Sequence, residues 1–307
     1  MNNVICIVGP TASGKTSLSV ELAKRINGEI ISADSMQIYK KLNIGTAKVT
    51  EEEMQGIPHH LLDIIPPEQD FSVADFKRLC FEKIDEIIKK NKIPIIVGGT
   101  GLYVSSVILD MNFEEQKIDE KYRNELYELA DKFSNEYVHN LLKEVDQRSA
   151  NEIHPNNLKR VIRALEMYKL NKIKSNHMDE EKERINNLTP KYNFKLFCLK
   201  LDKEMLHNRI NIRVDQMIKQ GLEEEAKLVY KLPNCTAKQA VGYKEFFRYF
   251  ENKINLNEVV EDIKLKTRQY AKRQMTWFKK MPKVIYLDAM DTKDKIIEEI
   301  MVNIYEK

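Results

Sequence analysis

The chain has 307 residues, of which 42% are hydrophobic, which is enough for a sizeable core and excludes a disordered chain. Lysine and arginine number 50 and aspartate and glutamate 47, so the net charge of +3 does not by itself indicate a nucleic-acid-binding protein. No stretch reaches the ~18 uninterrupted apolar residues of a membrane helix, and the N-terminal residues do not resemble a secretory signal. The four cysteines form no CxxC pair, which argues against a zinc ribbon and a disulfide framework. We therefore expect a cytoplasmic protein that does not associate with membranes.

The N-terminal third of the chain alternates between strand patterns and helix patterns. In chain order, the predicted elements are a strand at 3–8, a helix at 15–26, a strand at 29–32, a helix that begins at Ser72 and a strand at 93–97. The strand segments are apolar and rich in β-branched residues, as expected for strands that are buried on both faces. Ser72 and Asp75 form a capping box at the start of the second helix. Alternating strands and helices form a parallel sheet covered by helices, so this part predicts an α/β fold.

The rest of the chain divides into a helical part and a return to the sheet. Amphipathic helices are predicted at 120–133, 134–145 and 157–170, followed by a strand at 194–201, long helices at 203–220 and 257–280, a strand at 283–287 and a C-terminal helix. We therefore predict that residues 1–112 form the first part of an α/β core and that residues 113–190 form a helical insertion. Residues 191–307 then return to the core and add basic C-terminal helices.

A phosphate-binding motif lies between the first strand and the first helix. It fits the pattern GxxxxGK[ST] and comprises Gly9, Pro10, Thr11, Ala12, Ser13, Gly14, Lys15 and Thr16. The glycines allow successive backbone N–H groups to turn toward an anion, and the helix N-terminus adds positive potential. Lys15 is expected to bind terminal phosphate oxygens, and the Thr16 hydroxyl to ligate Mg²⁺. The motif predicts a P-loop that binds a nucleotide or another polyphosphate, without specifying which.

The residues that P-loop enzymes use to hydrolyse ATP are not evident. Such enzymes need an acidic residue at the end of a strand to hold Mg²⁺ and a residue that positions water. The strand at 93–97 ends in glycines without a carboxylate, and Asp63 is as easily a strand or loop residue. A loop sized for two phosphates can instead hold a diphosphate ligand directly.

Asp34 follows the second strand, at the edge of the sheet where the P-loop also lies. Ligands of open α/β sheets bind beyond the carboxyl ends of the strands, so this carboxylate could act as a general base. An equally simple interpretation is that Asp34 caps a short helix that begins at Ser35. The sequence leaves both interpretations open.

Glycine is scarce in this chain but clustered at one place. There are 10 glycines in total, and Gly98, Gly99 and Gly101 stand together at the end of the third apolar run. We interpret the cluster as a place where the backbone passes close to a ligand, with the Thr100 hydroxyl beside it. The alternative is a glycine-rich turn that packs tightly on the P-loop helix.

Two segments carry an excess of positive charge. Residues 157–174 hold six lysines and arginines against one acid, Glu166, and residues 264–280 hold seven cations and no acid. One face of the second helix carries Val259, Ile263, Tyr270, Gln274 and Trp277, and we expect Trp277 in the core. The cations lie off that face, which indicates a surface for a polyanion such as RNA or DNA. Lys264, Arg268 and Lys272 are spaced four residues apart and would align along a nucleic-acid backbone.

Taken together, the motifs resemble those of the bacterial tRNA dimethylallyltransferases, also called tRNA isopentenyltransferases. The matching segments are GPTASGKT at 9–16, DSMQIY at 34–39, GTAK at 45–48, PHHLLD at 58–63, VGGTGLY at 97–103, HPNNLKRVIRALE at 154–166, VGYKE at 241–245 and TRQYAKRQMTW at 267–277. They cover almost the whole chain in this order. The resemblance implies a P-loop NTPase-like parallel sheet flanked by helices, with a helical insertion that binds the tRNA anticodon stem-loop.

The resemblance also implies an activity and its residues. The enzyme would transfer a dimethylallyl group from dimethylallyl diphosphate to N6 of adenosine 37, next to the anticodon, and release diphosphate with the help of Mg²⁺. It assigns Asp34 as the base, Thr100 as a contact of the substrate nucleotide and Arg213 as a positive charge at the diphosphate. The implied tRNA contacts are Asp34, Ser35, Met36, Gln37, Thr100, Arg123, Lys159, Arg160, Val161, Ile162 and Arg163. The sequence identifies no protein partner, and a monomer is the simplest expectation.

Two other functions share part of this pattern. A P-loop small-molecule kinase also has a phosphate loop and an aspartate at the end of a strand, but it does not predict two basic helices. A non-catalytic, nucleotide-gated RNA-binding protein predicts the basic helices, but would not need Asp34. Transfer of a labelled dimethylallyl group to tRNA distinguishes the three.

Overall fold

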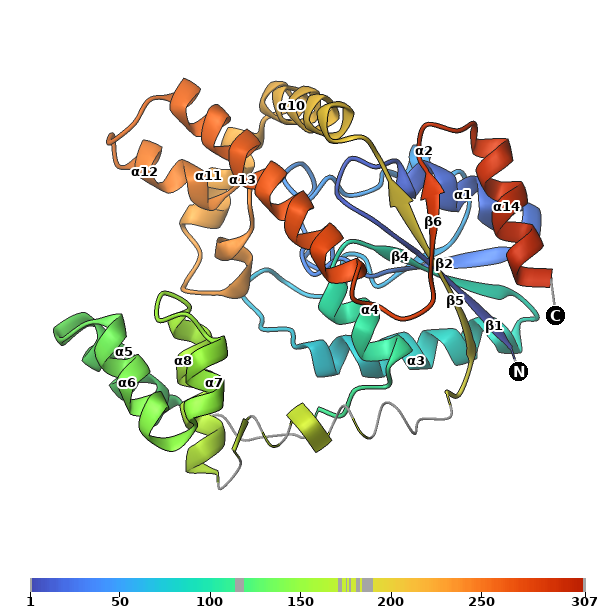
Figure 1. Cartoon of the computed structure of the whole chain (residues 1–307). Helices are drawn as coiled ribbons and strands as arrows, with labels where there is room; N and C mark the ends of the chain where they lie inside the picture. Colours follow the sequence, from blue (N-terminus) through green and yellow to red (C-terminus); the bar gives the residue numbers. More distant parts are fainter. Residues whose placement is uncertain are drawn as a thin grey trace. The chain divides into compact units, whose positions relative to one another are not determined.

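The computed structural model describes residues 2–113, 119–170, 173–174, 176, 178–180, 183 and 190–305. The chain divides into two compact units (Figure 1). The first comprises Met1–Ile108 and Pro190–Lys307 and is called the core unit below; the second comprises Leu109–Thr189 and is called the helical unit. In the described parts of the chain, no helix has both the length and the apolar composition needed to cross a lipid bilayer.

Among the described residues, six strands form one parallel sheet in the order β3-β2-β4-β1-β5-β6. The strands are β1 (Asn3–Val8), β2 (Gly28–Ser32), β3 (His59–His60), β4 (Ile93–Gly98), β5 (Asn193–Lys200) and β6 (Val284–Asp288). β5 follows the helical unit and pairs with β1, so the chain returns to the centre of the sheet. The predicted parallel α/β sheet is thereby confirmed. β3 was not predicted, because two residues are too few to show a period.

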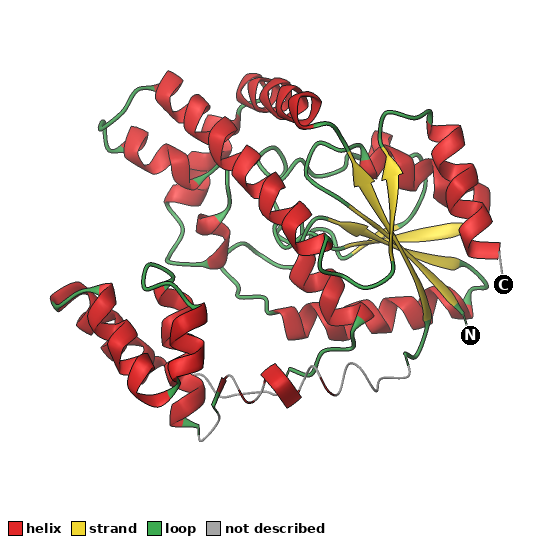
Figure 2. Ribbon diagram, viewed as in Figure 1, coloured by secondary structure: helices red, strands yellow, loops and turns green. Residues whose placement is uncertain are grey.

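Alternate residues of the central strands bury opposite faces of the sheet. Val4 and Cys6 of β1 pack against α3 (Val73–Lys89) and α4 (Gly101–Ile108). Ile5 and Ile7 pack on the other face, against α1 (Lys15–Ile26) and α14 (Lys293–Tyr305). Figure 2 shows the strands between these helices. Burial on both faces explains why these strands are almost entirely apolar.

Further helices of the core unit surround the segment that follows β2. They are α2 (Glu51–Met54), α10 (Lys203–Lys219), α11 (Leu222–Tyr230), α12 (Phe247–Phe250) and α13 (Leu256–Phe278), with 3-10 turns at Thr236–Gln239 and Lys244–Phe246. Residues of α10, α11 and α13 form one apolar cluster with Ile38, Tyr39 and Leu42. This cluster connects the C-terminal helices to the loop that carries Asp34. Trp277 is an exception to the prediction: its side chain is 37% exposed rather than buried in the core.

The helical unit has a core of its own. Its helices are α5 (Glu120–Lys132), α6 (Asn135–Val145), α7 (Gln147–Glu152) and α8 (Leu158–Lys169). The side chains of Asp119, Ser134 and Asp146 accept hydrogen bonds from the first turns of α5, α6 and α7, which fixes where these helices begin. Val161 and Ile162 of α8 are buried in this core, so these side chains are not available to contact tRNA as predicted.

Candidate active site

The P-loop connects β1 to α1 through three residues with positive φ. Gly9 (φ 143°) and Gly14 (φ 91°) occupy conformations that favour glycine, and Ala12 (φ 62°) is left-handed. A Cβ on Gly9 would lie 2.8 Å from the backbone oxygen of Leu199 in β5. The close contact with β5 is therefore a second reason for glycine at this position. Gly14 is the N-cap of α1 and supplies no side-chain cap. The N–H groups of the first turn of α1 are therefore open to an anion.

The polar groups of the P-loop are arranged for a ligand. The Lys15 ammonium donates to the backbone oxygen of Pro10 at 2.6 Å, which keeps the side chain folded over the loop. The Ser13 hydroxyl is buried and has no hydrogen-bond partner among the described residues. Burial lowers the pKa of Lys15 to about 8, and the Arg213 cation adds to this while Asp34 opposes it. Lys15 therefore still carries its charge at neutral pH.

A pocket of about 450 Å³ opens beside this loop, within the core unit. Its lining includes the P-loop residues from Thr11 to Thr16 and, from other elements, Ser32, Asp34, Gln37, Thr46, Ala47, His59, Gly98, Gly99, Arg209, Arg213, Tyr270, Gln274 and Lys293. The loops after β1, β2 and β4 meet here, at the edge of the sheet where α/β proteins bind ligands. The pocket thus combines the phosphate loop with the segment that carries Asp34.

Asp34 both caps a turn and faces the pocket. Its Oδ1 atom accepts hydrogen bonds from the backbone N–H groups of Met36 at 2.9 Å and Gln37 at 3.4 Å. Its Oδ2 atom has no hydrogen-bond partner among the described residues. The predicted helix at Ser35 is wrong, because residues 35–38 form a turn. Asp34 caps this turn with one oxygen, and its other oxygen remains available in the pocket.

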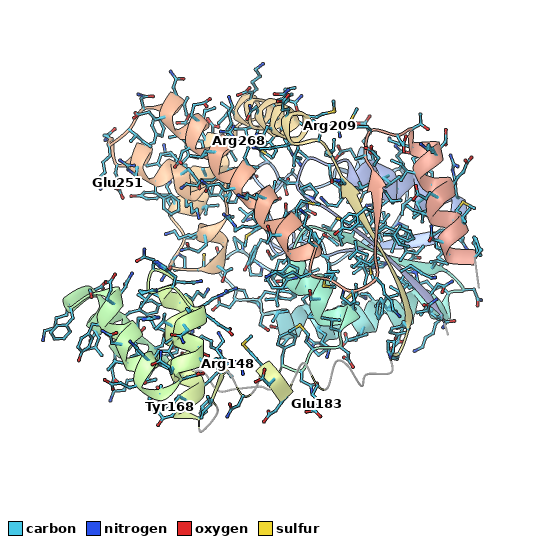
Figure 3. The ribbon with its side chains drawn as sticks, viewed as in Figure 1. Arg148, Tyr168, Glu183, Arg209, Glu251 and Arg268 are labelled. Atoms are coloured by element: carbon cyan, nitrogen blue, oxygen red, sulfur yellow. The ribbon has the colours of Figure 1, made fainter. Side chains whose placement is uncertain are left out.

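Arg213 connects α10 to the phosphate loop. Its Nη1 atom lies 3.3 Å from the Thr11 hydroxyl, which accepts the hydrogen bond. Burial lowers the pKa of the Arg213 guanidinium, and the nearby Asp34 carboxylate opposes that shift. Arg209, which Figure 3 labels, lies one turn earlier on α10. It also lines the pocket. Arg209 was not predicted from the sequence, although it lies four residues before Arg213 and therefore on the same face of the helix.

The glycine cluster is explained by packing against other protein segments. A Cβ on Gly98 would lie 2.2 Å from the backbone oxygen of Ala33. A Cβ on Gly99 would lie 2.1 Å from the side chain of Gln274, and one on Gly101 would lie 2.4 Å from Trp277. The segments that approach these glycines closely are therefore the loop after β2 and helix α13. This confirms the packing alternative, but with these segments rather than the P-loop helix as partners. Gly98 and Gly99 nevertheless line the pocket as well.

Thr100 and Gln37 make contacts within the protein. The Thr100 hydroxyl accepts a hydrogen bond from the Ser35 backbone at 3.0 Å and lies 3.3 Å from the Ser35 hydroxyl. These contacts join the loop after β4 to the loop after β2. The Gln37 amide donates to the backbone oxygens of Thr46 at 3.1 Å and Ala47 at 3.2 Å. Both side chains therefore shape the loops of the site.

Gln274 of α13 is a central residue that the sequence analysis did not select. Its side chain is 5% exposed and lies between two loops of the site. Its Oε1 atom accepts a hydrogen bond from the backbone N–H of Thr11 at 2.9 Å, and its Nε2 atom donates to the backbone oxygen of Gly99 at 3.0 Å. The signal was present, since Gln274 is a polar residue on the apolar face of this helix. A buried amide at such a position usually has specific hydrogen-bond partners.

The expectation that three cations of α13 align along a nucleic-acid backbone needs correction. Lys264 is 13% exposed and pairs with Asp215 at 2.8 Å and Glu261 at 3.0 Å. Arg268 donates to the side chain of Asn211 at 2.7 Å. Lys272 is exposed. Lys264 thus belongs to the contact between α10 and α13, and its charge is neutralised there.

The second basic segment, in the helical unit, is partly neutralised. Arg123 of α5 binds the buried carboxylate of Glu166 through two hydrogen bonds of 2.7 and 3.0 Å. Arg163 also donates to Glu166, at 3.3 Å. Lys159 and Arg160 are exposed on α8. Of the other predicted cations, Lys172 lies outside the described residues.

Comparisons with known proteins identify the family. The model of the IPP transferase family matches residues 37–281. The chain is 48% identical over 305 residues to a tRNA dimethylallyltransferase of Acetivibrio thermocellus, covering 98% of this chain and 96% of that relative. It is 50% identical over 290 residues to the tRNA dimethylallyltransferase of Bacillus anthracis, covering 94% and 91%. The chain belongs to this family of transferases.

Solved structures agree with this family assignment. A full-length tRNA isopentenylpyrophosphate transferase from Bacillus halodurans superimposes with a TM-score of 0.74 and 44% identity, covering 99% of this chain and 96% of that one. A eukaryotic dimethylallyltransferase acting on tRNA gives a TM-score of 0.81 and 33% identity, covering 98% and 78%. The predicted family, the P-loop NTPase-like fold and the enzyme class are thereby confirmed. The chain is a tRNA-modifying prenyltransferase, and neither the kinase nor the non-catalytic interpretation is supported.

We predict that Gln274→Ala destabilises the protein and weakens the site. The substitution leaves the Thr11 N–H and the Gly99 oxygen without their partner, and a buried polar group in that state costs about 1–3 kcal/mol. Urea unfolding followed by circular dichroism measures the loss. Gln269→Ala is the matched control, because Gln269 is an exposed glutamine on the same helix. Equal unfolding free energies for the two variants would contradict the bridging role.

Proposed function

We propose that this chain transfers the dimethylallyl group of dimethylallyl diphosphate to N6 of adenosine 37 of tRNA and releases diphosphate. The observation that carries the proposal is the composition of one pocket. Lys15 and Arg213 lie on its phosphate-loop side, and the carboxylate of Asp34, with one oxygen available, lines the same pocket. The names of the relatives support the substrates, since they are dimethylallyltransferases and isopentenylpyrophosphate transferases of tRNA.

The phosphate loop would hold the diphosphate. Its open N–H groups, the unpartnered Ser13 hydroxyl and the Lys15 ammonium are all hydrogen-bond donors that a diphosphate can satisfy. Arg213 adds a second cation beside Thr11. Diphosphate gains negative charge as the bond to the prenyl carbon breaks, so donors that are fixed in advance stabilise the transition state most. We assign Arg213 to catalysis on this ground.

The residues of the loop also fit Mg²⁺. Thr16 lines the pocket next to Lys15 and offers a hard oxygen ligand. Among the described residues, no group of three acidic, histidine or cysteine side chains could hold an ion alone. Mg²⁺ is usually held by one or two protein oxygens together with waters and substrate phosphates, which suits this site. When bound, the ion would supply positive charge to the diphosphate.

Asp34 would act as the base on the nucleotide. Its backbone hydrogen bonds orient the carboxylate and leave Oδ2 available. The adenine N6 attacks the first carbon of the dimethylallyl group, and the electron pair of the breaking C–O bond leaves with the diphosphate. The proton of N6 passes to Oδ2. An adenine amine is a weak nucleophile because its lone pair is delocalised into the ring, so removal of this proton during attack favours the product.

The helical unit would bind the anticodon stem-loop in the cytoplasm, where tRNA is modified. Lys159 and Arg160 offer exposed cations for phosphates. The bonds of Arg123 and Arg163 to Glu166 hold α5 and α8 together, so we assign Arg123 to positioning. Adenosine 37 must leave the base stack to reach a pocket, as in other enzymes that act on a base.

The direct test is a transfer assay. The full chain is incubated with Mg²⁺, dimethylallyl diphosphate and an unmodified tRNA that has adenosine at position 37, and the nucleosides are analysed by mass spectrometry. We expect one dimethylallyl group on adenosine 37 and none on a matched tRNA with guanosine there. No transfer to either tRNA, or phosphorylation that depends on ATP, would refute the proposal.

Replacement of Asp34 separates its two contacts. We predict that Asp34→Asn lowers kcat by ~10²–10⁴, the usual range for loss of a general base, with little change in tRNA affinity. Asparagine keeps an oxygen that can accept the bonds from Met36 and Gln37, whereas Asp34→Ala loses both the base and the cap. Single-turnover kinetics of both variants measure the effect. A near-wild-type rate for Asp34→Asn would reduce Asp34 to a capping residue.

Replacement of Lys15 tests the diphosphate site. We predict that Lys15→Met abolishes detectable binding of inorganic pyrophosphate with Mg²⁺, measured by calorimetry, because the loop loses a cation that lies within it. Lys24→Met is the control, since Lys24 is an exposed lysine on the same helix and does not line the pocket. If Lys15→Met and Lys24→Met bind pyrophosphate equally well, the assignment of the loop is incorrect.

A further inference from the structure

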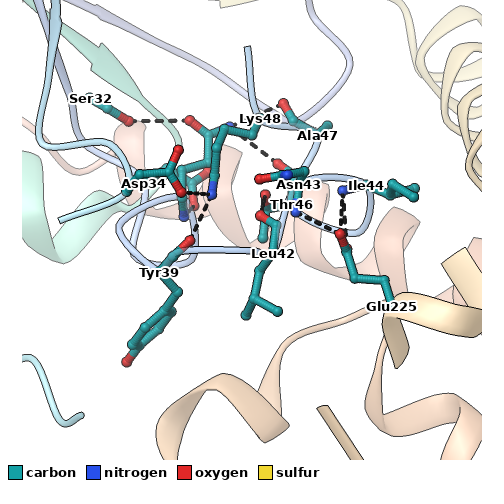
Figure 4. A network of polar contacts seen from close by, with 12 residues as sticks. Ser32, Asp34, Tyr39, Leu42, Asn43, Ile44, Thr46, Ala47, Lys48 and Glu225 are labelled. Carbon is teal, nitrogen blue, oxygen red and sulfur yellow. Dashed lines mark hydrogen bonds and ion pairs between the residues drawn. The ribbon is translucent and has the colours of Figure 1, made fainter. Parts of the chain in front are cut away.

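Glu225 is a buried carboxylate whose partners are mainly backbone groups. It lies in the first turns of α11 and is 7% exposed. Its oxygens accept hydrogen bonds from three consecutive N–H groups, of Asn43 at 2.7 Å, Ile44 at 3.0 Å and Gly45 at 2.8 Å (Figure 4). The Tyr243 hydroxyl donates a further bond at 2.7 Å. Glu225 does not line the pocket, so it makes no contact with a ligand there.

The bonds to Glu225 are strong ones. Among the described residues, no lysine, arginine or histidine forms an ion pair with it, so the four donors must compensate for its burial. Burial, and then the nearby Glu225 carboxylate, raise the pKa of Tyr243, which therefore remains protonated and donates its hydroxyl hydrogen. Hydrogen bonds to an ionised acceptor are about twice as strong as bonds between neutral groups. The segment at 43–45 is thus firmly fixed.

Two motifs that the proposed function leaves unexplained meet at this carboxylate. Gly45 belongs to GTAK at 45–48 and Tyr243 to VGYKE at 241–245. A Cβ on Gly45 would lie 2.5 Å from the Tyr243 ring, so the tyrosine can reach Glu225 only beside a glycine. Both motifs are therefore required for the same contact.

The fixed segment continues into a tight turn at 43–48. The backbone N–H of Ala47 donates to the backbone oxygen of Ile44 at 2.9 Å, and the backbone N–H of Lys48 donates to the backbone oxygen of Asn43 at 2.9 Å. The Thr46 hydroxyl donates to the backbone oxygen of Leu42 at 2.6 Å. This turn presents the oxygens of Thr46 and Ala47 to the side chain of Gln37.

Gln37 completes the connection to Asp34. Its side chain donates to the turn at 3.1 and 3.2 Å, and its Oε1 atom accepts from the Ser32 hydroxyl at 3.3 Å. Its backbone N–H donates to Asp34 Oδ1 at 3.4 Å. Glu225, the turn, Gln37 and Asp34 are thus connected by a series of hydrogen bonds. Figure 4 labels Glu225, residues of the turn and Asp34.

We propose that Glu225 is a positioning residue for the transfer reaction: its carboxylate fixes the turn at 43–48 and, through Gln37, the orientation of Asp34. This rests on the proposed function, in which Asp34 is the base. The diphosphate side of the pocket is held by other contacts, chiefly those of Gln274 and Arg213. Loss of the Glu225 carboxylate should therefore disturb the orientation of Asp34 more than the binding of the prenyl donor.

The test compares Glu225→Gln with Glu224→Gln. Glutamine has a single acceptor oxygen and directs an NH₂ group at N–H donors, so it cannot satisfy the segment at 43–45. We expect kcat for tRNA to fall by up to about 10²-fold, the scale for a misplacement of about 1 Å, with an unchanged KM for dimethylallyl diphosphate. Glu224 is exposed on the same helix, and its variant should match the wild type.

Two further readouts separate positioning from a general loss of stability. Amide hydrogen exchange should be faster at 43–48 in Glu225→Gln and unchanged at the P-loop. Gln37→Ala should also lower kcat. The variant that combines Glu225→Gln with Gln37→Ala should be no slower than the slower of the two single variants, because both substitutions interrupt the same series of hydrogen bonds. Additive effects, or an unchanged kcat despite faster exchange, would overturn the proposal.

The experiment remains decisive in two other cases. If Glu225→Gln does not fold, Tyr243→Phe removes one donor and keeps the ring, and a several-fold fall in kcat at unchanged KM is then expected. An unchanged kcat in Tyr243→Phe would count against the proposal. If the wild-type chain itself transfers no prenyl group, the proposed function fails, while hydrogen exchange still reports whether Glu225 holds the turn.

Discussion

Under the proposed function, one pocket must accommodate a diphosphate and the Asp34 carboxylate close to each other. Lys15 and Arg213 supply positive charge, and Asp34 is near enough to both to oppose the lowering of their pKa values by burial. In the proposed reaction, the same cations would stabilise the departing diphosphate. Because the groups lie in one protein pocket rather than in open water, their mutual interactions are strengthened. The rest of the site serves to hold these charges in place.

The loops of the site are held by side chains from distant parts of the chain. Gln274 of α13 joins the P-loop to the loop after β4, and Glu225 of α11 holds the turn at 43–48. Thr100 joins the loops after β4 and β2. Each contact uses backbone groups that lie outside the sheet and would otherwise lack partners. The C-terminal helices therefore contribute to the active site mainly through the loops that they fix.

The sequence could predict most of the fold and part of the site. Strands buried on both faces and the P-loop have local patterns, and both were predicted at their observed places. The partners of Lys264, Glu166 and Gly99 could not be predicted, because they lie on other elements that only the folded chain brings near. A glycine cluster in the sequence indicates that another group approaches the backbone closely. It does not indicate whether that group is a ligand or another segment of the protein. Val161 was assigned to tRNA through a family motif, although its apolar side chain belongs to the core of the helical unit.

The distance between Asp34 and the substrate base tests the central claim most directly. A structure of the chain with an anticodon stem-loop and an unreactive analogue of dimethylallyl diphosphate would measure it. The account predicts Asp34 Oδ2 within about 3.2 Å of adenine N6, or joined to it through one water, with the diphosphate in the P-loop. An adenine N6 that lies farther from Asp34 Oδ2 than this, with no bridging water, while the diphosphate occupies the P-loop would contradict the account.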